Sequence, residues 1–150
     1  MQQEIYIIDD TTELADKLQV MFKNEPDFHF VSMPSNNIDA VLKNIPTMII
    51  IEDDNTALSA LEICQKIRTN EDNSITPILI VSSVVDHDYR MDILKLSVQY
   101  YIVKPINEDY FYMTIKNMID FVTTNRRVSP LTGLPRKCSN SSRNKEEIVK

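Results

Sequence analysis

Two short apolar runs of this sequence end in acidic residues. The run "IYIIDD" ends in Asp9 and Asp10, and "MIIIEDD" ends in Glu52, Asp53 and Asp54. Carboxylates that gather in one place repel one another and need a cation to neutralise them. Oxygen ligands that leave room for water suit Mg²⁺. If the fold brings these runs together, their acids therefore predict a cation site.

Two further apolar runs end in groups that could act beside such acids. The run "PILIVSS" ends in Ser82 and Ser83, and "YYIVKP" ends in Lys104 and Pro105. A lysine and a hydroxyl close to a bound Mg²⁺ suit a phosphoryl group held by that metal. The four runs together therefore indicate phosphoryl chemistry, provided that their ends meet.

The elements that must position these residues follow from the hydrophobic pattern. Five runs rich in Ile, Val and aromatic residues predict strands at 4–8, 28–33, 47–51, 77–82 and 100–104. Between and after them, apolar residues recur at helical spacing. These include Ile38, Val41, Leu42, Ile45, Met91, Leu94, Tyr110 and Met113. Alternating strands and helices predict an α/β fold with a parallel sheet covered on both faces, and functional groups gather beyond the carboxyl ends of such strands.

Composition narrows the classes of function. The chain has 150 residues and a net charge of −6, with 43% hydrophobic and 25% charged residues, which is typical of one soluble domain. Residues 1–125 carry a net charge of −11 and residues 126–150 a net charge of +5. The acidic part is not expected to bind a nucleic-acid backbone directly. The basic tail is expected to be a solvated segment.

Targeting signals and cysteine pairs are not recognised in the sequence. No apolar run approaches a membrane span, and "MQQEIYIIDD" does not resemble a signal peptide. Cys64 and Cys138 form no C-x-x-C pattern, which predicts unpaired thiols in a reducing cytosol and a cytoplasmic protein. Because Gly133 is the single glycine, turns with positive φ are expected at asparagines instead, namely Asn24, Asn36, Asn44, Asn55 and Asn70.

The chain resembles the receiver domain of two-component response regulators over about residues 3–124. The resemblance rests on "IYIIDD", "PTMIIIE", "LEICQKIR", "TPILIVSS" and "YYIVKP", in that order and at the right spacing. It implies a flavodoxin-like (βα)5 fold with strand order 2-1-3-4-5 and a regulatory rather than an enzymatic role in a phosphorelay. In this family a histidine kinase transfers phosphate, with Mg²⁺ bound, to an aspartate at the end of the third strand. The implied division is a receiver domain at 1–124 and a linker with a polar tail at 125–150.

The resemblance assigns roles to individual residues. Asp9 and Asp10 match the acid pair that binds Mg²⁺, and Ser82 matches the switch hydroxyl. Tyr101 matches the switch aromatic residue, and Lys104 matches the lysine that contacts the phosphoryl group. The remaining assignments are the backbone carbonyl of Asp54 as a metal ligand and a Lys104–Pro105 peptide bond that is often cis in the family.

The acceptor position is where the chain departs from the family. Counting forward from Pro46 or back from "LEICQKIR" places Glu52 where the family has the phosphorylated aspartate and a metal ligand. Successive side chains of a strand point to opposite faces, so Asp53 is expected to point away from the acids unless a bulge re-aims it. Asp53 remains the alternative acceptor. Glu52 at this position predicts impaired phosphorylation, which leaves two interpretations. The domain is locked near its active conformation, or it is a pseudo-receiver that serves as a protein-binding module.

The sequence also bears on the partners of the chain and on an alternative function. The resemblance implies a histidine kinase or another signalling protein as partner, and it allows a homodimer through the fourth helix, fifth strand and fifth helix. A Mg²⁺-dependent phosphohydrolase of the haloacid dehalogenase type would need Asp-x-Asp after the first strand. Thr11 stands at the second of those positions.

The C-terminal region resembles a second family over a short stretch. Residues Pro130 to Pro135, "PLTGLP", match the opening of a diguanylate cyclase domain of the GGDEF type, whereas Ser129 and Arg136 depart from it. No GGDEF signature follows, and "CSNSSRNKEEIVK" has too few apolar residues to build a core. We therefore expect no cyclic di-GMP synthesis, and we expect the receiver to be part of a larger regulator or of one that has lost its output domain.

Overall fold

The structure is a computed structural model that describes residues 2–132, with side chains described as far as residue 124. The chain divides into two compact units, Met1–Ile115 and Lys116–Lys150. All strands and all candidate site residues belong to the first unit. Within the part of the chain that is described, no helix has both the length and the apolar character needed to cross a membrane.

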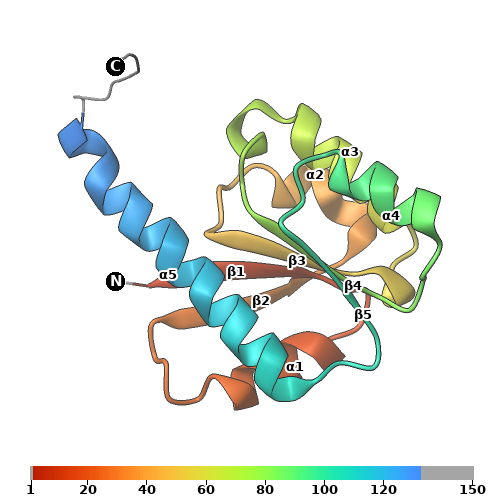
Figure 1. Cartoon of the computed structure of the whole chain (residues 1–150), viewed down its shortest axis with the longest axis horizontal. Coiled ribbons are helices and arrows are strands. Elements are labelled where there is room, and N and C mark those ends of the chain that lie inside the picture. Colours follow the sequence, from red (N-terminus) through yellow and green to blue (C-terminus); the bar gives the residue numbers. More distant parts are fainter. Residues whose placement is uncertain (1, 133–150) are drawn as a thin grey trace, which may run out of the picture. The chain divides into compact units, whose positions relative to one another are not determined.

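Strands and helices alternate along the chain (Figure 1). The strands are β1 Gln3–Ile8, β2 Phe28–Met33, β3 Met48–Glu52, β4 Ile78–Ser82 and β5 Tyr100–Val103. The α-helices are α1 Glu13–Met21, α2 Ile38–Val41, α3 Ala60–Thr69, α4 His87–Leu94 and α5 Glu108–Thr132. Short 3₁₀ turns occur at η1 Ser35–Asn37, η2 Asp53–Asn55 and η3 Glu71–Asn73.

The five strands form one parallel sheet in the order β2-β1-β3-β4-β5. Helices α2, α3 and α4 lie on one side of this sheet, and α1 lies on the other (Figure 1). The expected flavodoxin-like architecture and strand order are therefore confirmed. Because all strands run the same way, the ends of β1, β3, β4 and β5 meet at one edge.

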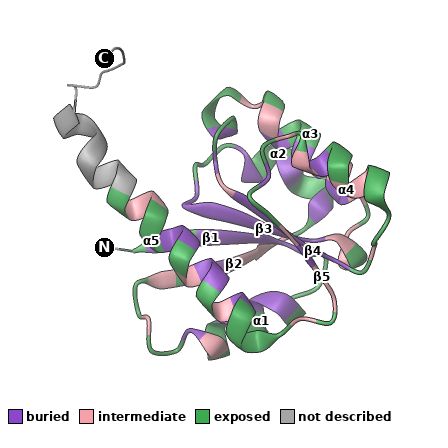
Figure 2. Ribbon diagram, viewed as in Figure 1, coloured by how far each residue is buried: buried purple, intermediate pink, exposed green. Residues whose placement is uncertain are grey.

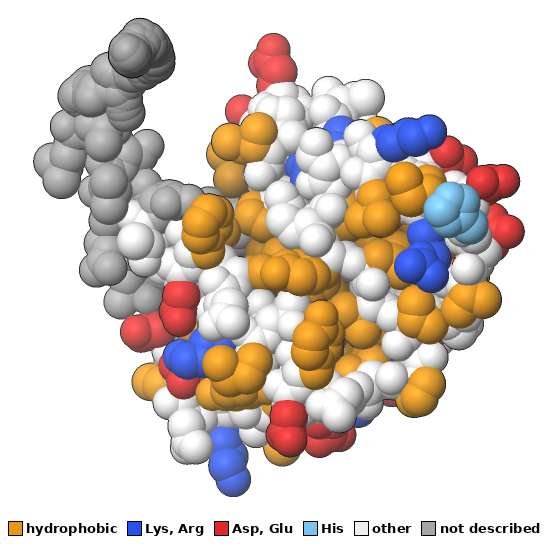
Figure 3. All heavy atoms as spheres, viewed as in Figure 1, with side chains coloured by type: hydrophobic (Ala, Val, Ile, Leu, Met, Phe, Trp, Pro, Cys, Tyr) orange, Lys and Arg blue, Asp and Glu red, His pale blue; other side chains and the backbone are white. Residues whose placement is uncertain are grey.

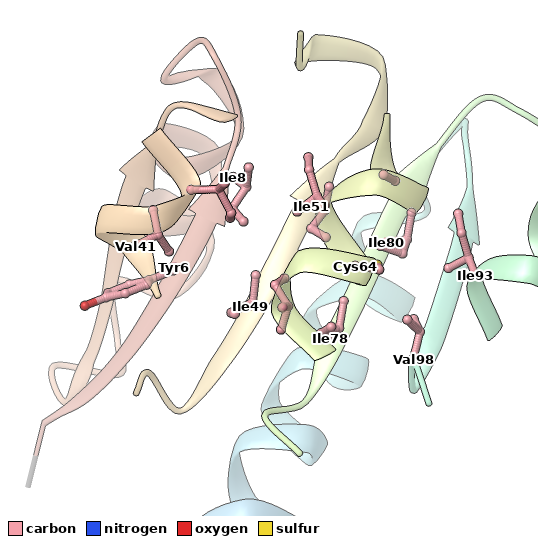
Figure 4. Close-up of a cluster of buried hydrophobic side chains, with 14 of the residues drawn as sticks. Tyr6, Ile8, Val41, Ile49, Ile51, Cys64, Ile78, Ile80, Ile93 and Val98 are labelled. Atoms are coloured by element: carbon pink, nitrogen blue, oxygen red, sulfur yellow. The ribbon is translucent and has the colours of Figure 1, made fainter. Parts of the chain in front are cut away.

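The three central strands are almost completely buried, as Figure 2 shows. Tyr6, Ile8, Ile49 and Ile51 pack in one cluster with residues of α2, α3 and α4 (Figure 4). Since side chains alternate along a strand, the residues between them face the opposite side of the sheet. Glu52 follows Ile51 and so belongs to the opposite face, towards α1. This alternation decides which groups Glu52 can meet.

Some residues expected in the core are exposed. Helix α2 ends at Val41, earlier than its pattern predicted, and Ile45 is 57% exposed. Met91 and Met113, expected as core residues, are also exposed. Helical spacing identifies a stripe but not its edges, so residues at the border of a stripe are assigned wrongly.

An aromatic contact that the hydrophobic pattern of the sequence did not predict joins the end of α1 to α5. Phe22, at the end of α1, is buried, and its ring stacks on Tyr112 with centroids 4.5 Å apart. The Tyr112 hydroxyl lies 3.4 Å from a carboxylate oxygen of Glu25. The end of α1 therefore packs against the first turns of α5.

The turn after α4 corrects the expectation about asparagines. Among the described residues, positive φ occurs at Ser97, with φ 61°, and not at any of the five asparagines named above. The Arg68 guanidinium donates hydrogen bonds to the carbonyls of Asn73, Leu96 and Ser97, at 3.0, 2.7 and 3.0 Å. Arg68 thus fixes a turn whose backbone conformation is unfavourable for serine.

Helix α5 continues to Thr132, across the proposed boundary at 124. Described backbone therefore includes the first residues of the stretch that resembles a GGDEF domain. From Gly133 onwards that stretch, and the polar tail with Cys138, lie outside the described residues. The division into a receiver and a tail thus stays a prediction, as does the expectation that the chain makes no cyclic di-GMP.

Candidate functional site

Lys104 lies between two of the acids that end β3. Its Nζ is 2.9 Å from Glu52 Oε2 and 3.0 Å from Asp54 Oδ2. The Glu52 side chain is only 6% exposed, whereas those of Lys104 and Asp54 are 30% and 28% exposed. Glu52 reaches this position because it closes β3 on the face towards α1, and the turn η2 brings Asp54 back over it. The backbone N–H of Asp54 also donates to Glu52 Oε1 at 3.2 Å.

The electrostatics of this cluster are set by burial and by the lysine. Burial raises the pKa of Glu52, and the contact with Lys104 lowers it by less, so the net direction is upward. For Asp54 burial is again the largest single effect and would raise the pKa, but the contacts with Lys104 and Ser83 together outweigh it and lower the pKa. Burial alone would lower the pKa of Lys104, but the two carboxylates raise it. The lysine is therefore held firmly in its charged form.

Asp53 points to the other side of the sheet, as strand alternation predicted. Its carboxylate accepts hydrogen bonds from the Ser82 hydroxyl at 2.8 Å, from the Tyr89 hydroxyl at 3.0 and 3.1 Å, and from the backbone N–H of Ala60 at 2.8 Å. Ser82 closes β4, Tyr89 lies on α4 and Ala60 begins α3. Asp53 therefore joins three elements on the face opposite to that of Glu52.

The acid pair that ends β1 is held by its own neighbours. Asp9 is 2% exposed, and its carboxylate accepts from the backbone N–H and hydroxyl of Thr11, both at 2.9 Å, and from the Leu14 N–H at 3.4 Å. Asp10 accepts from the Ser35 N–H and hydroxyl and from the Ala57 N–H, at 2.7 to 3.1 Å. Burial is the largest single effect and would raise the pKa of Asp10, but the hydrogen bonds from Ser35 and Ala57 together outweigh it and lower the pKa. The pair thus fixes the start of α1 and the loops after β2 and β3.

The remaining residue of the predicted site, Tyr101, lies on β5. The Tyr101 hydroxyl donates to the Val84 carbonyl at 2.8 Å, and the Arg90 guanidinium lies 5.7 Å from the centroid of its ring. Burial, more than any neighbouring charge, raises the pKa of Tyr101. The Lys104–Pro105 peptide bond is cis, as the resemblance implied. Tyr101 therefore contacts the loop between β4 and α4 and not the Lys104 cluster.

Apart from Tyr101, the predicted site residues thus form three groups. Glu52, Asp54 and Lys104 form one, Asp53 and Ser82 a second, and the β1 acids a third. A cavity of about 380 Å³ opens beside the first group, lined by Leu14, Lys17, Glu52, Asn55, Lys104 and Pro105. Two residues that hold these groups, Ser35 and Tyr89, were not among the predicted site residues, because their partners are distant along the chain. Ser83, which the sequence placed at the end of its strand beside Ser82, bonds to Asp54.

As placed, the side chains of these acids do not gather around one position for Mg²⁺. Within the described residues, no group of three or more His, Cys, Asp or Glu side chains is arranged to hold a metal ion. The Asp10 carboxylate faces Ser35 and Ala57, while Glu52 and Asp54 already have Lys104 as their cation. A lysine thus provides the charge compensation for which the sequence had suggested a metal.

We expect binding of Mg²⁺ to be weak, saturating at millimolar concentrations or above, because Asp10 must first release its three hydrogen bonds. NMR titration of the protein with MgCl₂ measures this affinity, and D10N should abolish the shifts around residue 10. Micromolar affinity, or binding that D10N leaves unchanged, would contradict the expectation.

Comparisons with known proteins identify the fold. No protein-family model matches the chain. A signal receiver domain of a two-component histidine kinase from Clostridium thermocellum is 22% identical, with TM-score 0.70 over 79% of this chain and 98% of the other. A two-component response regulator from Clostridium difficile is 20% identical, with TM-score 0.67 over 79% and 97%. The receiver domain of a sensor histidine kinase from Pseudomonas aeruginosa, which has a magnesium ion in its active-site cleft, is 15% identical, with TM-score 0.66 over 80% and 99%. At these identities the similarity establishes the fold.

Proposed function

We propose that this chain contains the receiver domain of a two-component response regulator, with Glu52 in the acceptor position. The observation that carries the proposal is the contact of Lys104 with Glu52 and Asp54 at the carboxyl edge of a 2-1-3-4-5 sheet. In the resemblance, this lysine is the residue that approaches the acceptor and its phosphoryl group. The role is regulatory, and the partner is a histidine kinase or another signalling protein.

Glu52 makes this a receiver with impaired phosphorylation. Its carboxylate is nearly buried, is paired with Lys104 through one oxygen and accepts from the Asp54 N–H through the other, which restricts the approach of a phosphoryl donor. Asp53 is supported less well as an acceptor. Both of its oxygens accept hydrogen bonds on the opposite face, where Tyr89 and Ser82 cover them. We therefore favour a protein-binding module over a phosphorylated switch.

A hydrophobic surface supports protein partners. Exposed large residues of α4, β5 and the start of α5 are Met91, Tyr100, Tyr110 and Met113. On the face viewed in Figure 3, hydrophobic side chains fill the middle, and acidic and basic ones lie mainly around them. We propose that this surface, on α4, β5 and the first turns of α5, binds a signalling partner or a second copy of the chain.

Phosphorylation tests the proposal. We expect the wild-type chain to gain no phosphoryl group from acetyl phosphate with Mg²⁺, whereas E52D should be labelled, because its carboxylate is one methylene shorter and further from Lys104. Intact-mass spectrometry detects the added group, and hydroxylamine should remove an acyl phosphate. The double variant E52D/K104M is the control and should lose most of the label.

Two outcomes would contradict this proposal. Labelling of the wild-type chain at Asp53 would make that residue the acceptor. Steady release of phosphate from an aryl phosphate would favour a phosphohydrolase of the haloacid dehalogenase type instead. Thr11, at the position where that class needs its second aspartate, donates its hydroxyl to Asp9, which supports a structural role for this pair.

A further inference from the structure

Helix α4 has little apolar contact with the sheet. Ile93 is its one buried residue, while Tyr89 and Leu94 are partly buried against the same core cluster. A helix that buries so little apolar surface opens easily unless polar contacts hold it. The polar contacts of α4 with the residues that follow β3 are therefore important for holding α4 against the sheet.

Those contacts converge on Asp53. One oxygen of its carboxylate accepts from the Ser82 hydroxyl at 2.8 Å, and the Tyr89 hydroxyl lies within 3.1 Å of both oxygens. Burial, and then the charge of Asp53, raises the pKa of Tyr89, so the phenol keeps the proton that it donates. The backbone N–H of Ala60 donates a further hydrogen bond to the carboxylate at 2.8 Å. Asp53 thus ties the end of β4 and the first turn of α4 to the start of α3.

The hydrogen bond that Ser82 donates to Asp53 leaves its hydroxyl no proton for a second donation. A serine hydroxyl has one proton, and here it is donated to Asp53 while the oxygen accepts from the Val84 N–H at 3.0 Å. The same hydroxyl cannot also donate to a group bound beside Lys104. In the proposed receiver, Ser82 would be the residue that reports on such a group.

We propose that Asp53 is a positioning residue that latches Ser82 and Tyr89, and so fixes the β4–α4 loop and α4 from the face opposite to that of Glu52. Ser83 also connects this loop to Asp54, and through it to Lys104, by hydrogen bonds of 2.9 and 3.1 Å. The inference rests on the proposed function for the role of Ser82 as the switch hydroxyl and for the comparison with a phosphoryl group. The Asp53 carboxylate thereby holds the Ser82 hydroxyl in place of a phosphoryl group. The surface on α4 is then set permanently and is not switched.

Hydrogen exchange measured by mass spectrometry on the full chain tests the latch. Y89F should speed exchange in peptides covering residues 83–95 by about tenfold to a hundredfold, because one hydrogen bond to a charged group is lost. D53N should have a similar effect, since asparagine keeps one acceptor, and D53A a larger one. V20A, at an exposed valine of α1 outside the proposed partner surface, is the control and should change nothing.

The location of the change decides the result. Peptides covering β1 should exchange at the wild-type rate in Y89F and D53N. These two variants keep the latch testable even if D53A fails to fold. Unchanged exchange over 83–95 in both variants would overturn the latch, and so would an equal rise in β1, which would show general loosening. Labelling of E52D is measured separately, so failure of the latch and failure of the proposed function are distinguishable.

Discussion

Replacing Lys104 with methionine should lower the free energy of unfolding by about 2–4 kcal/mol. Methionine keeps most of the side-chain volume but leaves Glu52 nearly buried beside Asp54 with no cation. The value lies towards the lower end for a broken buried pair, because water reaches Lys104 and Asp54. Urea denaturation followed by circular dichroism measures the loss.

Lys17 provides the matched control for this change. Its Nζ lies 3.4 Å from Glu108, but both side chains are well exposed, so K17M should cost less than about 1 kcal/mol. The double variant K104M/E52Q should recover part of the loss, since it removes the buried charge as well as its partner. Equal effects of K104M and K17M would show that the Lys104 cluster contributes no more than a surface pair.

The loss in K104M should also depend on pH. Burial already raises the pKa of Glu52 in the folded protein, and removing Lys104 raises it further. A carboxyl group with a raised pKa favours the folded state when protonated, and this stabilisation is lost as pH rises through the folded-state pKa. The difference between wild type and K104M should therefore be smaller at about pH 5 than at about pH 8. A difference that grows on acidification would contradict the assigned direction.

Replacing Arg68 with alanine should cost about 2–3 kcal/mol. The guanidinium is the common donor to the carbonyls of Asn73, Leu96 and Ser97, and no single smaller side chain can reach all three. R68K keeps the charge but not the planar fork, so it should fall between alanine and wild type. The same denaturation experiment measures both variants.

Ser97 offers an internal check on that interpretation. Its φ of 61° is costly for serine and free for glycine, so S97G should stabilise the protein by about 1 kcal/mol. If Arg68 holds this turn, S97G should recover part of the loss in R68A. An R68A variant within about 0.5 kcal/mol of wild type would mean that water replaces the three hydrogen bonds without cost.

The sequence was sufficient to predict the sheet. Its strands, their parallel direction and the edge where functional groups collect follow from apolar runs separated by helical patterns, because burial on both faces leaves a strong signal in β1, β3 and β4. The order of the strands came from the resemblance to receiver domains. Strand alternation also placed Glu52 and Asp53 on opposite faces correctly. The borders of helices were less predictable, as the exposed Ile45, Met91 and Met113 show.

Hydrogen-bond partners within the site could not be predicted. The sequence put the acids of β1 and β3, Ser82 and Lys104 at one edge, but it could not show that Ser82 faces Asp53 and not Glu52. That choice depends on the turn η2 and on Tyr89, which approaches from 36 residues further along the chain. Spacing along the chain carries no information about such distant contacts. The role of Arg68 was hidden for the same reason.

The two edge strands have a consequence for aggregation. Strands β2 and β5 leave one side of their backbones unpaired, and such edges can recruit a strand from another molecule. Here β5 is only four residues long and is followed by Lys104 and Pro105, while β2 lies between Pro26 and Pro34. Proline has no N–H to donate and interrupts a ladder. Growth of the sheet into fibrillar assemblies is therefore disfavoured at both edges, even though its central strands are among the most apolar segments of the chain.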